Sequence, residues 1–109
     1  ALLAATWPAA AQVSDDVVKI GVLNDQSGIF ADLGGQGSVV AARMAVEEFG
    51  GTVLGKPVEI IFGDHQNKPD IGSAIAQRWI DVEKVDAIAD VPSSATALGI
   101  LNVTREKNK

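Results

Sequence analysis

Short apolar runs alternate three times along the chain with longer segments whose apolar residues recur at spacings of three and four. The runs are VVKIGVLND (residues 17–25), KPVEIIFGD (56–64) and VDAIADV (85–91). Apolar runs rich in β-branched residues are typical of strands that are covered on both faces of a sheet. Pro57 lies at the start of the second run, where its missing N–H costs least. The pattern therefore predicts three strands.

Each run is followed by a segment with a helical pattern, and Gly50 and Gly51 end the first of these segments. The residues expected on one helical face are Val39, Ala42, Val46 and Phe49, then Ile71, Ile75, Trp79 and Val82, then Ala97, Ile100, Leu101 and Thr104. Alternating strands and helices predict an α/β fold with a doubly wound parallel sheet of three βα units. We expect the first strand in the centre, the other two on either side, and the first and second helices on opposite faces.

Composition narrows the classes of function. The 109 residues suit one small domain, and a net charge of −5 without a lysine or arginine run argues against nucleic-acid binding. The chain has no cysteine, which excludes disulfides and thiolate zinc sites, and its single histidine, His65, excludes a multi-histidine metal cluster. We therefore expect neither a metal nor a cofactor.

Residues 1–11, ALLAATWPAAA, are uncharged and end in small residues, like the last part of an exported protein's signal segment and its cleavage site. The alternative is an ordinary alanine-rich helix. A transmembrane span is not expected, because the run is far shorter than about 20 residues and contains Pro8. We interpret residues 1–11 as a signal-peptide remnant and expect a periplasmic location.

Ligands of open parallel sheets bind beyond the carboxyl ends of the strands, which here are the loops 25–37, 64–69 and 91–95. In the third loop, Pro92 shapes the turn and either Ser93 or Ser94 can cap the following helix. The N–H groups of such a helix start can hold an anion without any lysine or arginine. The alternative is that the serines are only N-caps.

Enzymatic interpretations have weaker support. The glycines of the first loop do not form G-x-G-x-x-G, and no G-x-x-x-x-G-K-[ST] occurs. Asp25, Asp64 and His65 could be drawn as an acid–base set, but there is no nucleophile elbow, and aspartates that follow strands usually serve turns and caps. Trp79 is expected in the core rather than as a stacking platform. We predict a binding protein that is not an enzyme.

The strings KIGVLNDQSGIFADLGGQG, GGTVLGKPVEIIFGDHQNKPD and VDAIADVPSSATAL occur in this order and together resemble the periplasmic type I solute-binding proteins of branched-chain amino-acid ABC transporters. The resemblance covers residues 17–109. It implies that residues 12–109 form the N-terminal part of the first of two lobes, with the second lobe absent. The implied partners are a small carboxylate ligand, such as a branched-chain amino acid or an aromatic acid, and a membrane permease.

The resemblance also implies roles for residues of the cleft. Ser94 would be the main donor to the ligand carboxylate, and Ala95 and Thr96 would add amide or hydroxyl bonds, whereas Ser93 is a neighbour that can cap instead. Ile29 and Phe30 would line the mouth of the apolar part of the cleft.

Two alternatives stay open: a ligand-sensing regulatory domain of the same fold, and a nucleotide-dependent α/β enzyme. Because three strands bury little surface and leave an apolar edge open, the fragment is also expected to self-associate.

Overall fold

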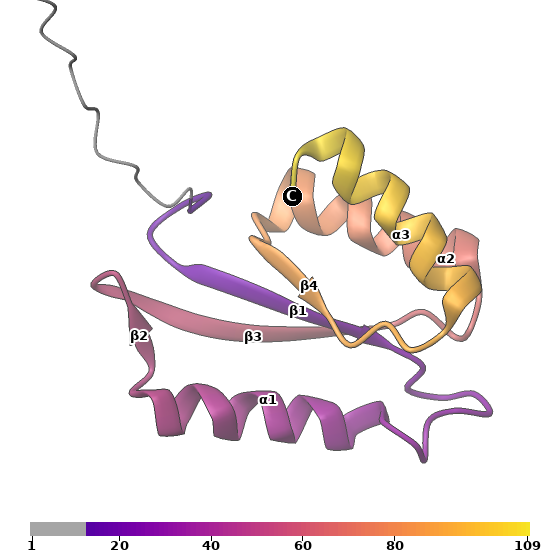
Figure 1. Cartoon of the computed structure of the whole chain (residues 1–109), viewed down its shortest axis with the longest axis horizontal. Helices are drawn as coiled ribbons and strands as arrows, with labels where there is room; N and C mark the ends of the chain where they lie inside the picture. The colour runs from indigo at the N-terminus through magenta and orange to yellow at the C-terminus, as the bar shows by residue number, and fades with distance from the viewer. Residues whose placement is uncertain (1–12) are drawn as a thin grey trace, which may run out of the picture.

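The computed structural model describes residues 13–109, so the expected signal remnant lies outside the described residues. The described residues form a four-stranded sheet in the order β2-β3-β1-β4 (Figure 1). β1 (Val18–Asn24) is central, and β3 (Lys56–Asp64) and β4 (Ala87–Ala89) flank it, both parallel to it. The predicted order and direction of the three parallel strands are confirmed.

The fourth strand, β2 (Thr52–Val53), is not among the predicted elements. It pairs antiparallel with the first residues of β3, with Thr52 opposite Pro57 and Val53 opposite Lys56. Leu54 and Gly55 join the two strands with φ angles of 52° and 75°. Two consecutive left-handed residues form the turn that best matches the twist of a hairpin. The sheet is therefore mixed rather than purely parallel.

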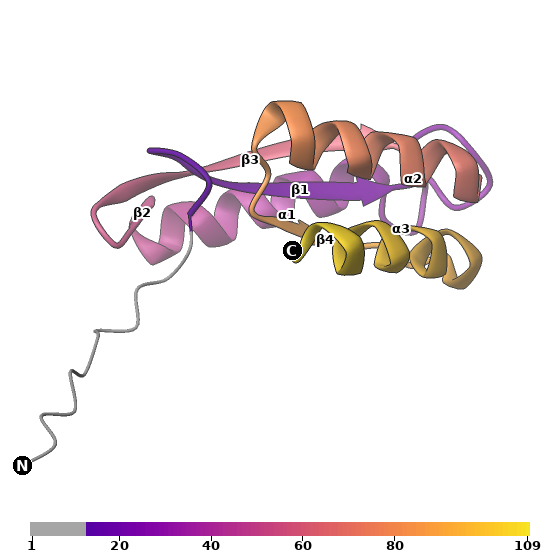
Figure 2. The same ribbon diagram turned by 90° about the horizontal axis from the view of Figure 1, so that it is seen from above.

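Helices cover both faces of the sheet. α1 (Gly35–Phe49) lies on one face, and α2 (Pro69–Arg78) and α3 (Ser94–Lys107) lie side by side on the other (Figures 1 and 2). This confirms the predicted placement of the first two helices on opposite faces. No helix among residues 13–109 combines the length and the apolar character needed to cross a membrane.

The predicted apolar face of the second helix is wrong at its last member. α2 continues into a π-helical turn, η1 (Trp79–Glu83), which ends at Lys84 in the left-handed conformation. The wider turn shifts the 3.6-residue period, so Ile80 is buried and Val82 is 69% exposed. In α1, Val39 is buried, but Phe49 in the last turn is 68% exposed.

Trp79 lies in the core, as predicted, and its indole packs directly on the sheet. A Cβ atom on Gly21 of β1 would stand 2.6 Å from Trp79 Cε3, and one on Gly63 of β3 would stand 2.9 Å from Trp79 Cζ2. Any side chain at either position would overlap the indole ring. The two glycines therefore allow η1 to approach the sheet closely.

We predict that Gly21→Ala lowers the free energy of unfolding by about 1–3 kcal/mol, because overpacked cores force side chains and backbone to shift. Gly37→Ala is the matched control, since a Cβ atom there meets no atom within 4 Å. That substitution should raise stability by up to about 1 kcal/mol through helix propensity. Urea unfolding measures both variants, and wild-type stability in Gly21→Ala would contradict the packing argument.

Candidate functional site

A cavity of about 620 Å³ opens at the carboxyl end of the parallel strands. Its wall comes from the loop after β1 and the start of α1, from Asn67 in the loop after β3, and from residues 90 and 92–95 after β4. These are the three loops that the topology predicted to meet at this edge. The first turns of α1 and α3 both border the cavity, and neither contains an acidic residue.

Four of the six predicted site residues line this cavity: Phe30, Ser93, Ser94 and Ala95. Ile29 does not line it and is 81% exposed, so its role in the cleft stays a prediction.

Ser93 occupies the N-cap position of α3, with φ −78° and ψ 114°, and its carbonyl accepts the amide of Ala97 at 2.8 Å. Its hydroxyl makes no capping hydrogen bond. Helix geometry leaves the first amides of α3, those of Ser94, Ala95 and Thr96, without intrahelical acceptors. The start of α3 therefore presents donors that no side chain of residues 13–109 uses.

Thr96 is fully buried, and its Oγ1 has no hydrogen-bond partner within residues 13–109. The side chain is wedged between two helices, since a Cβ atom on Gly72 of α2 would stand 2.5 Å from Thr96 Cγ2. The predicted hydroxyl contribution of Thr96 therefore has no route to the cavity in this arrangement. Its backbone amide, in the first turn of α3, remains a candidate donor.

Asn24, the last residue of β1, is a site residue that the sequence reasoning missed. Its side chain is 1% exposed. The Nδ2 group donates to Asp90 Oδ2 at 2.8 Å and to the carbonyl of Gly35 at 3.1 Å, while Oδ1 accepts from Gln26 Nε2 at 2.6 Å. One amide thus joins the β4–α3 loop to the β1–α1 loop. The available signal was a polar residue that ends an otherwise apolar strand.

The two aspartates of the candidate acid–base set bind loop segments: Asp25 binds its own loop, and Asp64 binds mainly the loop after β1. Asp25 is buried and accepts the amides of Gly28 at 2.7 Å and Phe30 at 3.1 Å. Asp64 accepts the amide of Gln26 at 2.9 Å and the hydroxyl of Ser27 at 2.6 Å. Burial raises the pKa of Asp64, but its hydrogen bonds outweigh burial and hold that pKa below the ordinary value. Both carboxylates act as turn and loop acceptors, which favours the structural interpretation.

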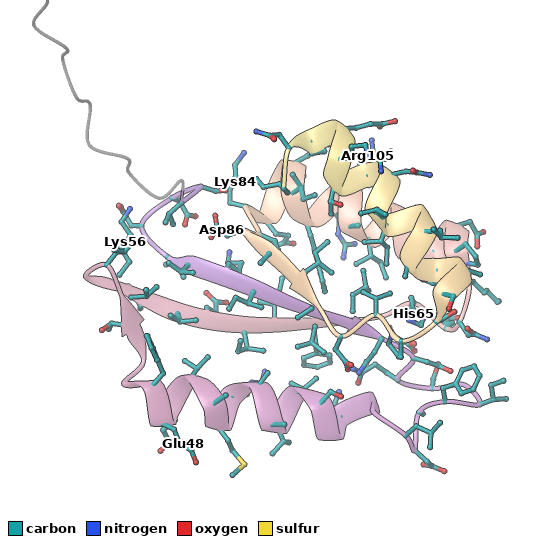
Figure 3. The ribbon with its side chains drawn as sticks, viewed as in Figure 1. Glu48, Lys56, His65, Lys84, Asp86 and Arg105 are labelled. Carbon is teal, nitrogen blue, oxygen red and sulfur yellow. The ribbon has the colours of Figure 1, made fainter. Side chains whose placement is uncertain are left out.

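His65 lies fully buried where the loops meet, near the start of α3 (Figure 3). Its Nδ1 accepts the amide of Asn67 at 2.9 Å, so the neutral ring carries its proton on Nε2. That Nε2 has no partner within residues 13–109. Burial lowers the pKa of His65, against the opposing charges of Asp25, Asp64 and Asp90. No group of three or more histidine, cysteine, aspartate or glutamate side chains in the described part of the chain could hold a metal.

We predict that the buried neutral His65 makes folding stability depend on pH. Because its pKa is lowered on folding, the unfolded chain binds the extra proton first, and stability falls as pH drops below 6.5. The slope should approach, and not exceed, about 1.4 kcal/mol per pH unit. Hydrogen bonds outweigh burial and lower the pKa values of Asp64 and Asp86. The stability that these two groups add is lost only as pH falls to about 3.8 and below, so they do not account for a slope at higher pH.

Chemical unfolding between pH 7.5 and 5 measures this slope. His65→Asn should be less stable at pH 7.5 but should lose most of the slope. Equal slopes in wild type and variant would assign the pH dependence to other groups.

A family model described as "Periplasmic binding protein" matches residues 17–109. Among solved structures, the chain is 48% identical to a periplasmic binding protein from Burkholderia mallei, with a TM-score of 0.83, covering 86% of this chain and 25% of that one. It is 47% identical to a branched chain amino acid ABC transporter periplasmic ligand-binding protein from Burkholderia xenovorans LB400, with a TM-score of 0.81, covering 84% of this chain and 25% of that one.

The chain is also 28% identical to a solute binding protein of an ABC transporter from Rhodopseudomonas palustris BisB5, whose structure is a complex with 3,4-dihydroxy benzoic acid. The TM-score is 0.77, and the match covers 84% of this chain and 25% of that one. Comparison with curated proteins returned no match. The chain spans about a quarter of the length of the solved proteins that it matches.

Proposed function

The chain belongs to the periplasmic binding protein family, and on that premise we propose that it forms one wall of the ligand cleft of an exported solute-binding protein. In this proposal the whole protein binds a small carboxylate and delivers it to the membrane permease of an ABC importer. The role is one of binding and carries no catalysis. Relatives described as ABC transporter ligand-binding proteins support this assignment.

The observation that carries the proposal is the start of α3 in the wall of the cavity. Ser93 and Ser94 border the cavity, and neither hydroxyl makes a hydrogen bond with another part of residues 13–109. A carboxylate placed there receives amide donors from the first turn and the positive end of the helix dipole. The dipole term is worth about 0.3–1 kcal/mol when exposed and more when partly buried.

The remainder of the cavity suits an apolar group attached to the carboxylate. Phe30 and Leu33, in the loop after β1, contribute apolar surface to the wall of the cavity. Leu33 is 83% exposed and Phe30 39% exposed, so both have apolar surface left for a ligand to cover. A branched-chain amino acid and an aromatic acid both combine a carboxylate with an apolar body of this kind.

We predict that Ser94→Ala, in the longer protein that carries this chain, weakens binding of its carboxylate ligand by about ten- to a hundredfold. A hydrogen bond to a charged group is worth roughly 1.5–3 kcal/mol, and each 1.4 kcal/mol is tenfold in Kd. Ser93→Ala is the comparison, and because its hydroxyl makes no capping bond it should leave the melting temperature close to wild type. Calorimetric titration measures both affinities.

Unchanged affinity in Ser94→Ala would mean that the carboxylate binds elsewhere. A lowered melting temperature in Ser93→Ala would instead show that its hydroxyl caps α3 in solution.

We further propose that residues 13–109 self-associate when isolated. A groove between β4 and α3, lined by Ile88, Val91 and Leu101 among others, is open, and the outer edge of β4 has no partner among the described residues. Leu98 and Leu101 on α3 are 64% and 49% exposed. Unpaired edges and contiguous apolar faces promote association.

We predict that light scattering shows a mean mass that rises with concentration, and that Leu101→Lys reduces the rise. Leu54→Lys, on the β2–β3 turn away from this groove, is the control with the same substitution at another exposed leucine. A monomer of constant mass at all concentrations would count against self-association.

A further inference from the structure

We propose that Asp90 selects ligands by charge, favouring a carboxylate that carries a positively charged group and disfavouring a simple carboxylate. This inference rests on the proposed function, because it concerns the same cavity. It identifies a specificity-determining residue that lies outside the serine loop and that the sequence reasoning did not single out.

The position of Asp90 is the first observation. The residue follows β4, lines the cavity and lies four residues before Ser94. Its backbone is left-handed, with φ 57°, a conformation that is uncommon outside glycine. Asn24 Nδ2 donates to its Oδ2 at 2.8 Å, and its Oδ1 accepts no hydrogen bond from residues 13–109. The carboxylate is thus held at the cavity with one oxygen available to a ligand.

The charges around the cavity are the second observation. The ionisable residues in its wall are Asp25 and Asp90, and no lysine or arginine of the described part lines it. Asp25 is 1% exposed, and both of its oxygens accept loop amides. Asp90 has an exposed side chain and forms no ion pair with any of residues 13–109, whose ion pairs are Lys107–Asp81 and Lys109–Asp86. The negative charge of Asp90 therefore acts directly on a bound ligand.

The size of this effect follows from the dimensions of the cavity. Asp90 and Ser94 line the same cavity of about 620 Å³, so a carboxylate at the start of α3 shares that cavity with the charge of Asp90. At an effective dielectric constant of about 20, two like charges at about 8–10 Å weaken binding by about ten- to thirtyfold. A ligand ammonium beside Asp90 reverses the sign of this contribution.

The test compares α-amino acids with the same molecules lacking the amino group, using the longer protein that carries this chain. The probes are leucine with 4-methylpentanoate and phenylalanine with 3-phenylpropionate, titrated calorimetrically. Within the pair that it binds, wild type should have an affinity for the amino acid at least about tenfold higher than its affinity for the deamino analogue. In Asp90→Asn the affinity for the simple carboxylate should rise about tenfold, and the affinity for the amino acid should fall about tenfold. The substitution should keep the loop in place, since the new amide oxygen still accepts the hydrogen bond from Asn24.

Glu48→Gln is the matched control, because it removes the same charge from the exposed outer side of α1, far from the cavity (Figure 3). It should change neither affinity. Binding that depends on Ser94 but keeps the same amino-acid preference in wild type and Asp90→Asn would overturn the role of Asp90 alone. Failure of all four probes to bind wild type would overturn the preference for amino acids. Binding of 3,4-dihydroxybenzoate that weakens in Ser94→Ala would in that case leave the proposed function standing.

Discussion

The buried side-chain amide of Asn24 is the interaction on which the geometry of the cavity depends. A buried amide left without partners is costly, so the chain segments that satisfy it are held in place around the end of β1. Asn24 reaches Gly35 and Gln26 on one side and Asp90 on the other, and Asp90 lies 66 residues away in sequence. The loop before α1 and the loop before α3 thus share one anchor, and Asp90, whose backbone is left-handed, lies at that anchor.

Close packing of the helices determines where the start of α3 lies. Gly72 of α2 leaves room for Thr96, and Gly99 of α3 lies where an added Cβ atom would stand 2.7 Å from Ser73 Oγ. A glycine on each helix therefore lets α2 and α3 approach closely near their first turns. Trp79, where α2 continues into η1, packs on Gly21 of β1 and so fixes the other end of α2 on the sheet. Packing against α2 therefore holds the first amides of α3 at the carboxyl edge of the sheet.

Periodicity was sufficient to predict the parallel strands, because burial on both faces leaves a clear apolar signal. The doubly wound arrangement with right-handed crossovers predicted their order and the opposite faces of the first two helices. Periodicity missed β2, since two residues are too few to show a period, and it misplaced Val82, since a π-helical turn breaks the helical period. Ser93 and Ser94, which line the cavity, were expected there from their position after a strand, whereas Ala95 was expected from the family resemblance. Asn24 and Asp90 were not, because the burial of an amide and the aim of a carboxylate depend on partners distant in sequence.

The acidic composition of the chain also shapes what the cavity can bind. Asp25, after β1, and Asp64, at the end of β3, take up amides of the β1–α1 and β3–α2 loops, so those backbone donors are already satisfied. The first turn of α3 contains no acidic residue and its capping serine leaves the amides unused. The proposed carboxylate site at α3 therefore keeps its amide donors, whereas the negative potential of the neighbouring aspartates extends over the rest of the wall. In such a site the backbone amides of α3 supply the positive end and the aspartates supply the negative charge. No lysine or arginine of residues 13–109 lines the cavity.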